Sequence, residues 1–266
     1  MKDIATIVAH MVVPKPNKAC GSHFYKYSSP ERLERLRDII LQHRIYIPTI
    51  GELNDPADGR PIVASMSEDK LFSFLHLDFL RRNPHLTSAA HEKEALRIRY
   101  NIRSHGPEPL RRVLAEILNR HLEGFRIYSM SKRYDNLSLW AKYASNHSGY
   151  CLEFANEGGL FEHAKEVIYG DTVQMDVMNP EHRSGYWFFC KRPEWSNEEE
   201  VRLVAVHGTA CKTPINPRWL TRLILGMHMS DANQKSIHDW VRQRRPELVV
   251  VSAHYDQLDQ KLTLNP

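Results

Sequence analysis

The chain has 266 residues, of which 42% are hydrophobic and 26% are charged, a composition that is typical of globular proteins and excludes a disordered chain. No apolar run reaches the roughly 20 residues that cross a bilayer, and the short apolar opening at residues 4–13 predicts no secretory signal. We therefore expect a cytoplasmic protein with no membrane partner. The formal net charge of +4 permits an acidic partner, such as a nucleotide or a nucleic acid, without requiring one.

The first predicted strand is the aromatic and basic segment HFYKY at residues 23–27. Its period of two places Tyr25 and Tyr27 on the same face. Ser29 and Pro30 then supply the N-cap and the first position of a helix that is expected to end near His43. Two further features follow this helix, a short strand and a tight turn with the sequence ELNDP, at residues 44–47 and 52–56.

Residues 67–124 have a helical composition, with apolar side chains at helical spacing near both ends. We interpret this block as a helical insert or lid that packs on a sheet within a single domain spanning residues 1–266. The block is rich in arginines, which indicate either a solvated surface or a basic patch for a polyanion, namely Arg81, Arg82, Arg97, Arg99, Arg103, Arg111 and Arg112.

The rest of the chain alternates irregularly between strand and helix patterns. Strands are predicted at residues 125–131, 149–154, 164–169, 220–227, 248–253 and 261–264, and helices at residues 136–145 and 231–245. Residues 185–191 fit either the end of a helix or the start of a buried strand. This irregular order predicts an α+β fold with a mixed, largely antiparallel sheet and a helical insert.

The segment KRPEWSNEEEVRLVAV at residues 191–206 is the main candidate for a functional site. Strand alternation would place Glu198, Glu200 and Arg202 on one face, with Trp195 just ahead of them. Two interpretations remain open at this point. The face is either an exposed strand with ordinary charge pairs or a row of side chains that performs chemistry.

Familiar catalytic and metal-binding motifs do not occur in the sequence. There is no GxxxxGK[ST] phosphate loop, no GxGxxG fingerprint, no HExxH helix and no CxxC pair. The four cysteines are widely spaced, which argues against a disulfide framework and a zinc knuckle. We predict no metal site.

Several ordered segments together resemble an uncharacterised bacterial family, the one catalogued as domain of unknown function 2971. The segments are FYKY (24–27), RIYIP and ELNDP (44–56), SMS (129–131), LWAKYASNHSGYCLEF (139–154), VIY (167–169) and KxxxWxxExExR (191–202). This resemblance spans most of the chain and is weakest over the helical block.

A more remote similarity is to ADP-ribosyltransferases, including those that modify DNA bases. The similarity implies NAD as co-substrate, an acceptor that is a protein or a nucleic acid, and a sheet that splits in the manner of that family. The implied catalytic residues are Glu200 and Glu198, and the implied cofactor-binding residues are Tyr25, Lys26, Ser131, Trp140 and Tyr143.

The implied reaction is cleavage of the nicotinamide N-glycosidic bond of NAD, and its chemistry suggests a role for each of these residues. The reaction passes through a cationic, oxocarbenium-like sugar, which a nearby carboxylate stabilises. Glu200 is the first choice for this role, and Glu198 would orient the acceptor or take its proton. The rings of Tyr25, Trp140 or Tyr143 would stack on nicotinamide or adenine, and Lys26 would bind the pyrophosphate.

The alternative function is a non-catalytic module that recognises a nucleotide or a nucleic acid through the arginine-rich helical block. This alternative includes a role as a defence or toxin effector. Such binding would depend strongly on salt, because phosphate contacts release counterions.

Overall fold

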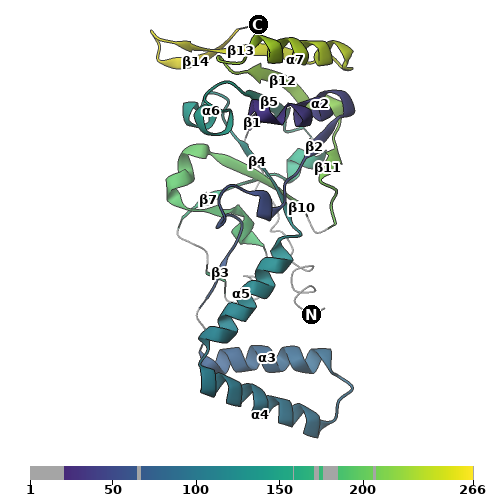
Figure 1. Cartoon of the computed structure of the whole chain (residues 1–266), viewed down its shortest axis with the longest axis vertical. Helices are drawn as coiled ribbons and strands as arrows, with labels where there is room; N and C mark the ends of the chain where they lie inside the picture. The colour runs from purple at the N-terminus through teal and green to yellow at the C-terminus, as the bar shows by residue number, and fades with distance from the viewer. Residues whose placement is uncertain are drawn as a thin grey trace.

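The computed structural model describes residues 21–64, 67–157, 159–170, 174–175, 185–205 and 208–265. It contains an eight-stranded sheet with the strand order β14-β13-β12-β5-β1-β4-β10-β6 (Figure 1). Strands β12 and β13 run parallel, whereas the other neighbouring pairs in this sheet are antiparallel. The predicted α+β fold with a mixed, largely antiparallel sheet is therefore confirmed.

The strands of the large sheet are β1 (His23–Ser28), β4 (Arg126–Ser131), β5 (Tyr150–Ala155), β6 (Lys165–Glu166), β10 (Glu200–Ala205), β12 (Leu220–Leu225), β13 (Val249–Asp256) and β14 (Lys261–Asn265). Three two-stranded sheets accompany it, formed by β2 (Arg44–Tyr46) with β11 (Lys212–Pro214), β3 (Ile62–Val63) with β8 (Gln174–Met175), and β7 (Ile168–Tyr169) with β9 (Cys190–Lys191). The helices are α2 (Leu33–Gln42), α3 (Glu68–Arg82), α4 (Ser88–His105), α5 (Glu108–Leu122), α6 (Leu137–Tyr143) and α7 (Asp231–Gln243).

Alternating strand residues bury both faces of the large sheet. Leu152 of β5 and Leu223 of β12 point into a core that includes the apolar faces of α2 and α7. Their neighbours Cys151 and Ile224 point the other way, into a core that includes Trp140 of α6. The middle of the sheet is therefore covered by helices on both sides, as the period of two requires for strands buried on both faces.

The connection from β1 to α2 places Arg32, and one turn later Arg35, beside the sheet. Ser29 accepts a hydrogen bond from the backbone N–H of Glu31, and Pro30 opens the short 3-10 helix η1 (Pro30–Arg32). Helix α2 follows directly and ends at His43 in the left-handed conformation. The predicted cap and helix end are confirmed, and this turn fixes the position of Arg32 at the start of the helix.

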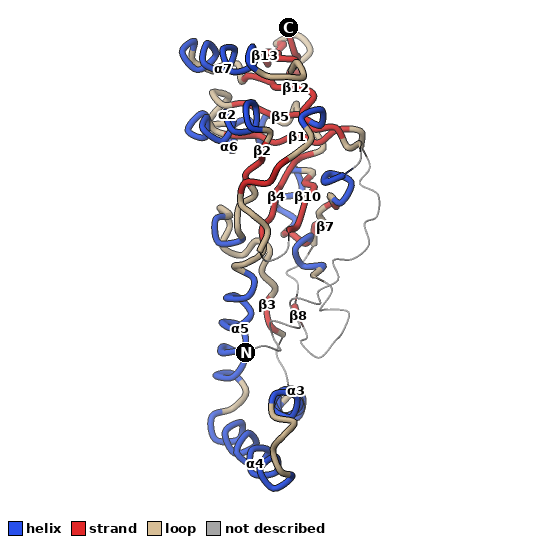
Figure 2. The backbone as a smooth tube through the Cα atoms, turned by 90° about the vertical axis from the view of Figure 1, so that its right-hand side faces the viewer, coloured by secondary structure: helices blue, strands red, loops and turns tan. Residues whose placement is uncertain are grey.

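The helices α3, α4 and α5 lie apart from the large sheet. In both ribbon views α5 extends away from the sheet, and α3 and α4 lie at the end of the molecule opposite β13 and β14 (Figures 1 and 2). Their apolar side chains join a separate core with Trp187, Phe188 and Phe189. The helices expected between residues 67 and 124 are present, and their role as a lid stays a prediction.

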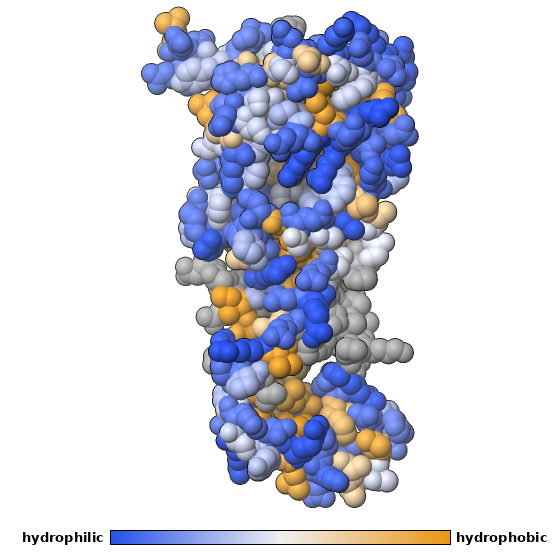
Figure 3. Space-filling model, viewed as in Figure 1, coloured by the Kyte–Doolittle hydropathy of each residue, from blue (hydrophilic) through white to orange (hydrophobic). Residues whose placement is uncertain are grey.

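Apolar side chains also gather on the surface of this helical block (Figure 3). Leu77, Leu96, Tyr100 and Val113 are exposed. Several arginines of the block form ion pairs on their own helix, including Arg82 with Asp78, Arg97 with Glu94, and Arg111 with Glu108. Much of the positive charge expected for a basic patch is therefore neutralised locally.

Two segments differ from a simple interpretation of the sequence, the strand predicted at residues 164–169 and the segment at residues 185–191 that fitted either a helix end or a strand start. Residues 164–169, predicted as one strand, form two short strands, β6 and β7, that belong to different sheets. Residues 186–189 form the 3-10 helix η5 (Tyr186–Phe189), and β9 follows at once. Each two-residue strand is too short for the alternation of its sequence to be recognised.

Candidate functional site

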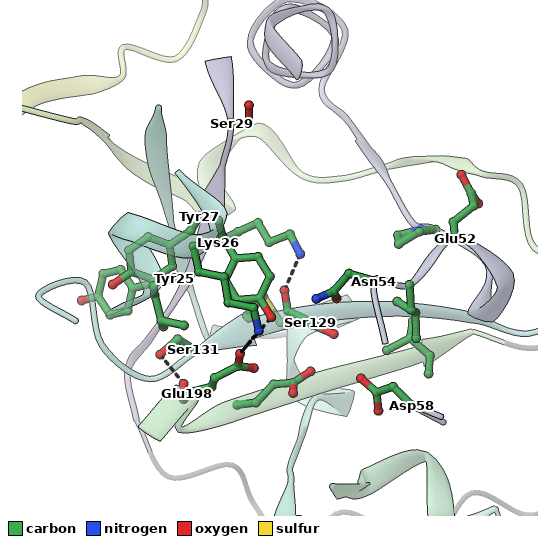
Figure 4. A pocket seen from close by; sticks show the side chains of 18 of the residues that line it. Tyr25, Lys26, Tyr27, Ser29, Glu52, Asn54, Asp58, Ser129, Ser131 and Glu198 are labelled. Atoms are coloured by element: carbon green, nitrogen blue, oxygen red, sulfur yellow. Dashed lines mark hydrogen bonds and ion pairs between the residues drawn. The ribbon is translucent and has the colours of Figure 1, made fainter. Parts of the chain in front are cut away.

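The candidate site is a cavity of about 580 Å³ at the point where β1 and β4 separate. In the described chain these two strands pair at a single position, Tyr25 with Ser131, whereas β1 follows β5 from His23 to Ser28. Lys26 and Tyr27 of β1 and Ser129 and Met130 of β4 line the cavity beyond this position. Figure 4 shows Lys26 extending from β1 toward Ser129 on β4. A volume of this size is within the usual range for small-molecule sites.

Three residues predicted from the sequence meet in register at this separation. Ser131 is the Cα partner of Tyr25 on one side and of Glu200 on the other. The row therefore crosses β1, β4 and β10, three adjacent strands that are distant in the sequence. All three residues line the cavity.

A cluster of carboxylates forms one end of the cavity around the buried ammonium group of Lys191. Lys191 Nζ lies 2.7 Å from Glu198 Oε2, 2.9 Å from Glu200 Oε2 and 3.9 Å from Asp58 Oδ2. Burial alone would lower the pKa of Lys191, but the Glu200 and Asp58 carboxylates outweigh burial and raise it. Lys191 is thus a permanent cation that holds the acidic side chains together.

Glu200 is locked between Lys191 and Arg202. Arg202 is fully buried and donates to both Glu200 oxygens, at 2.6 and 2.9 Å, and to Asp58 at 2.8 Å. Burial would raise the pKa of Glu200, but these two cations lower it to about 2. The interpretation of this face as an exposed strand with ordinary charge pairs is therefore wrong, because Glu200 and Arg202 are both buried. Burial makes any unpaired charge costly, so these side chains need the partners that they have.

Glu198 reaches the cluster from outside strand β10. It ends the 3-10 helix η6 (Pro193–Glu198), and Glu199 follows in the left-handed conformation with φ of 44°. The expectation that Glu198 and Glu200 alternate along one strand is therefore wrong. The left-handed residue interrupts the strand alternation between η6 and β10, and the two carboxylates reach Lys191 from these two elements.

The second oxygen of Glu198 faces α6. Tyr143 donates its hydroxyl to Glu198 Oε1 at 2.8 Å, and Lys142 Nζ lies 3.1 Å from the same oxygen. Burial and the Glu198 carboxylate raise the pKa of Tyr143, which therefore remains a proton donor. The Lys142 ammonium also lies 3.6 Å from the centre of the Trp195 ring, and this ring does not line the cavity.

Three cations, Lys26, Arg32 and Arg35, line another part of the cavity, the cationic end, together with Glu52, whose carboxylate accepts from Tyr46 and from the backbone N–H of Thr49. Lys26 donates to the backbone carbonyl of Ser129 at 2.7 Å, and burial lowers its pKa to about 8. The Arg35 guanidinium lies 3.8 Å from the centre of the Tyr46 ring. Within the described residues, none of these three cations has a carboxylate within ion-pair distance. This end of the cavity is therefore suited to an anionic ligand.

Of the other two predicted cofactor-binding residues, Ser131 lines the cavity and Trp140 does not. Ser131 lies at the row described above, where its hydroxyl donates to the Glu198 carbonyl at 2.8 Å and so ties β4 to η6 (Figure 4). Trp140, expected to stack on the cofactor, is fully buried and outside the cavity. Its ring packs edge-on against Tyr27, and its Nε1–H donates to the Tyr134 carbonyl. The expected platform at Trp140 is therefore replaced by a core contact.

Sequence reasoning missed five functional candidates, namely Arg32, Arg35, Asp58, Lys142 and Lys191. The arginine pair carried a usable signal, because residues three apart on a helix share a face directly after the first strand. Lys191 is the first residue of the segment KxxxWxxExExR, but the sequence alone suggests no function for it. Asp58 had no local signal, since its partner Arg202 is 144 residues away.

Among the described residues, no group of three or more His, Cys, Asp or Glu side chains is arranged to hold a metal ion. No described helix has the length and apolar character of a membrane span. Comparisons with family models, curated proteins and solved structures return no match. The resemblance to domain of unknown function 2971 and to ADP-ribosyltransferases stays a prediction.

Proposed function

We propose that the protein is an ADP-ribosyltransferase-like enzyme that uses NAD and transfers ADP-ribose to a protein or nucleic-acid acceptor. The observation that carries this proposal is the row Tyr25, Ser131 and Glu200 at the point where β1 and β4 part. The row brings together the three segments that the remote similarity assigns to the cofactor and to catalysis. It lies beside a cavity with one cationic end and one carboxylate end.

The charge distribution of the cavity suits the two halves of NAD. The pyrophosphate is dianionic and would bind Lys26, Arg32 and Arg35, whose charges have no carboxylate partner within the described chain. The ribose attached to nicotinamide would then lie near Glu198 and Glu200. Tyr25 and Tyr143 line the same cavity and offer ring faces for the bases.

The proposed reaction breaks the bond between ribose C1′ and the nicotinamide ring nitrogen. The bonding electron pair goes to that nitrogen, so the positively charged pyridinium leaves as neutral nicotinamide. Positive charge develops on the ribose and is stabilised by a carboxylate. An acceptor nucleophile then forms a bond to C1′ and loses its proton to a base.

The two glutamates are suited to different parts of this reaction. Both oxygens of Glu200 already accept from Arg202, and one also accepts from Lys191, so its charge is largely offset. Glu198 is also bound by two cations, Lys191 at Oε2 and Lys142 at Oε1, and Tyr143 donates its hydroxyl to Oε1. Lys142 is partly exposed, however, so it offsets the charge of Glu198 less than the buried Arg202 offsets that of Glu200. We assign Glu198 to the ribose cation and Glu200 to the positioning of Lys191, which refines the first choice of Glu200.

Incubation of the protein with NAD and measurement of released nicotinamide test this proposal. The Glu198→Gln variant is expected to lower the rate by at least about 100-fold, as loss of a transition-state stabiliser does. Glu194→Gln is the matched control, because Glu194 lies on the same 3-10 helix with an exposed side chain and does not line the cavity. Equal rates in the two variants would remove Glu198 from catalysis, and a lower rate in Glu200→Gln alone would restore Glu200 to that role.

A second candidate is nucleotide binding without catalysis. The full pairing of Glu200 favours it, because a carboxylate already bound by two cations does little for a third positive charge. This candidate places the nucleotide in the same cavity and not on the helical block, where Arg82, Arg97, Arg111 and Arg112 form ion pairs on their own helices. Binding of NAD with no release of nicotinamide under any acceptor would support it.

A further inference from the structure

The connection between α6 and β5 has a backbone conformation that the function proposed above does not use. Ser145, Asn146 and His147 follow one another with φ values of 47°, 52° and 66°. Residues other than glycine rarely adopt this left-handed region, because their Cβ atom then approaches the following carbonyl oxygen. Three such residues in succession carry strain that persists only where the surrounding structure maintains it. We call residues 145–147 the left-handed turn.

The left-handed turn completes the C-terminal end of α6. The backbone N–H groups of Asn146 and His147 donate to the carbonyls of Ala141 and Trp140, at 3.0 and 3.2 Å. These carbonyls belong to the last turn of the helix, where carbonyl groups have no partner inside the helix. Helix α6 has only seven residues, and an isolated helix shorter than about 12 residues is marginal in water. The left-handed turn therefore fixes where α6 ends and how its last residues are oriented.

Residues that follow β12 hold the left-handed turn from the other side. The backbone N–H of His228 donates to the carbonyl of His147 at 2.9 Å, and the His228 imidazole Nδ1 lies 3.0 Å from the carbonyl of Asn146. A carbonyl can only accept, so Nδ1 carries the hydrogen of this bond. Gly226 lies so close that a Cβ atom at its position would be 2.1 Å from the His147 carbonyl oxygen. Both backbone and side-chain contacts thus keep the turn in its strained conformation.

The last two residues of α6 belong to the candidate site. Lys142 and Tyr143 both bind Glu198 Oε1, at 3.1 and 2.8 Å, and both line the main cavity. Only Ala144 separates Tyr143 from the left-handed turn. Hydrogen bonds weaken steeply when their angle departs from the preferred range. A small rotation at the end of α6 would therefore release Glu198 Oε1 from its partners.

We propose that His228 is a positioning residue that acts on Glu198 through the left-handed turn and the end of α6. This inference rests on the proposed function, in which Glu198 faces the ribose cation. Without the imidazole, the strained turn relaxes, and Tyr143 and Lys142 lose their alignment with Glu198 Oε1. His228 itself does not line the cavity, so it acts on the ligand only through these side chains.

Nicotinamide release by three variants at position 228 tests this inference. The amide nitrogen of His228→Asn takes the place of the imidazole Nδ1, that of His228→Gln reaches the place of Nε2 instead, and His228→Ala has no donor. We expect kcat to fall about 3- to 10-fold in the alanine and glutamine variants, the effect of one lost hydrogen bond. The asparagine variant should retain the kcat of the unaltered protein. His238→Ala is the matched control, because His238 is an exposed histidine on α7.

Two further measurements separate positioning from a general loss of stability. Affinity for ADP-ribose is expected to be unchanged in His228→Ala, because the pyrophosphate would bind at the cationic end and not at Glu198. In a Tyr143→Phe background, His228→Ala should lower kcat by no more than about twofold, since the contact that it positions is already lost. A full additional loss in that background, or a kcat of His228→Asn as low as that of His228→Ala, would overturn the inference.

Crystal structures of the variants test the inference without any activity. The Tyr143 hydroxyl should move away from Glu198 Oε1 in His228→Ala and keep its 2.8 Å contact in His228→Asn. If this displacement occurs but the unaltered protein releases no nicotinamide from NAD, only the proposed function is contradicted. If His228→Ala keeps the contact between Tyr143 and Glu198, this inference alone is contradicted.

Discussion

The two ends of the main cavity differ in how their charges are satisfied. At the carboxylate end, Glu198, Glu200 and Asp58 are buried and bound to Lys191 or Arg202. At the cationic end, Lys26 and Arg32 have no carboxylate within ion-pair distance in the described part of the chain. The carboxylates of the first end already have cationic partners, which supplies rigidity. The second end has charge left over, which a bound anion would neutralise.

The largest expected effect comes from breaking the paired end. Arg202→Met leaves Glu200 and Asp58 buried with only Lys191 as a cation, and we expect a loss of about 3–5 kcal/mol in the free energy of unfolding. Chemical denaturation measures this change. Arg133→Met is the control, because Arg133 forms its ion pairs at the surface and should cost no more than about 1 kcal/mol. Similar losses in the two variants would show that the buried cluster is not a structural centre.

A smaller effect is expected on ligand binding when the cationic end is changed. Arg32→Gln removes a charge that faces the cavity, and we expect affinity for ADP-ribose to fall about tenfold with little change in stability. Arg37→Gln makes the same substitution on α2, at an exposed position that does not line the cavity. Calorimetry compares the two. If both variants bind ADP-ribose as the unaltered protein does, the anion does not lie at this end.

The smallest effect is a dependence of binding on pH. Burial lowers the pKa of Lys26 to about 8, so its ammonium is present below pH 8 and is lost as the pH rises above that value. A dianionic ligand needs the ammonium, so affinity for ADP-ribose should decline by up to about tenfold between pH 7 and pH 9. Lys26→Met should bind weakly at both values and show no such decline. An equal decline in that variant would assign the titration to another group.

The sequence predicts the helices and strands better than it predicts which of them pair and in what register. Period two and capping residues located β1, α2 and β4, because these signals are local. The pairing of Tyr25, Ser131 and Glu200 depends on strand order, which no local pattern contains. The remote resemblance assigns these segments to one site, and that assignment stays a prediction.

The errors at the site have particular physical causes. The alternation of residues 198–202 predicts a strand that includes Glu198, because the sequence pattern gives no sign of the left-handed conformation at Glu199. Trp140 was assigned to the ligand because an aromatic residue on a short helix does not indicate which face is buried. Its indole N–H is satisfied by a backbone carbonyl, and a satisfied polar group of this kind is seen only in three dimensions.

The most direct test of the central claim is a crystal structure of the protein with ADP-ribose bound. The account predicts the ligand in the cavity between β1 and β4, with its pyrophosphate beside Lys26 and Arg32 and with ribose C1′ facing Glu198. Binding of ADP-ribose on the helical block, or an empty cavity at saturating ligand, would contradict it.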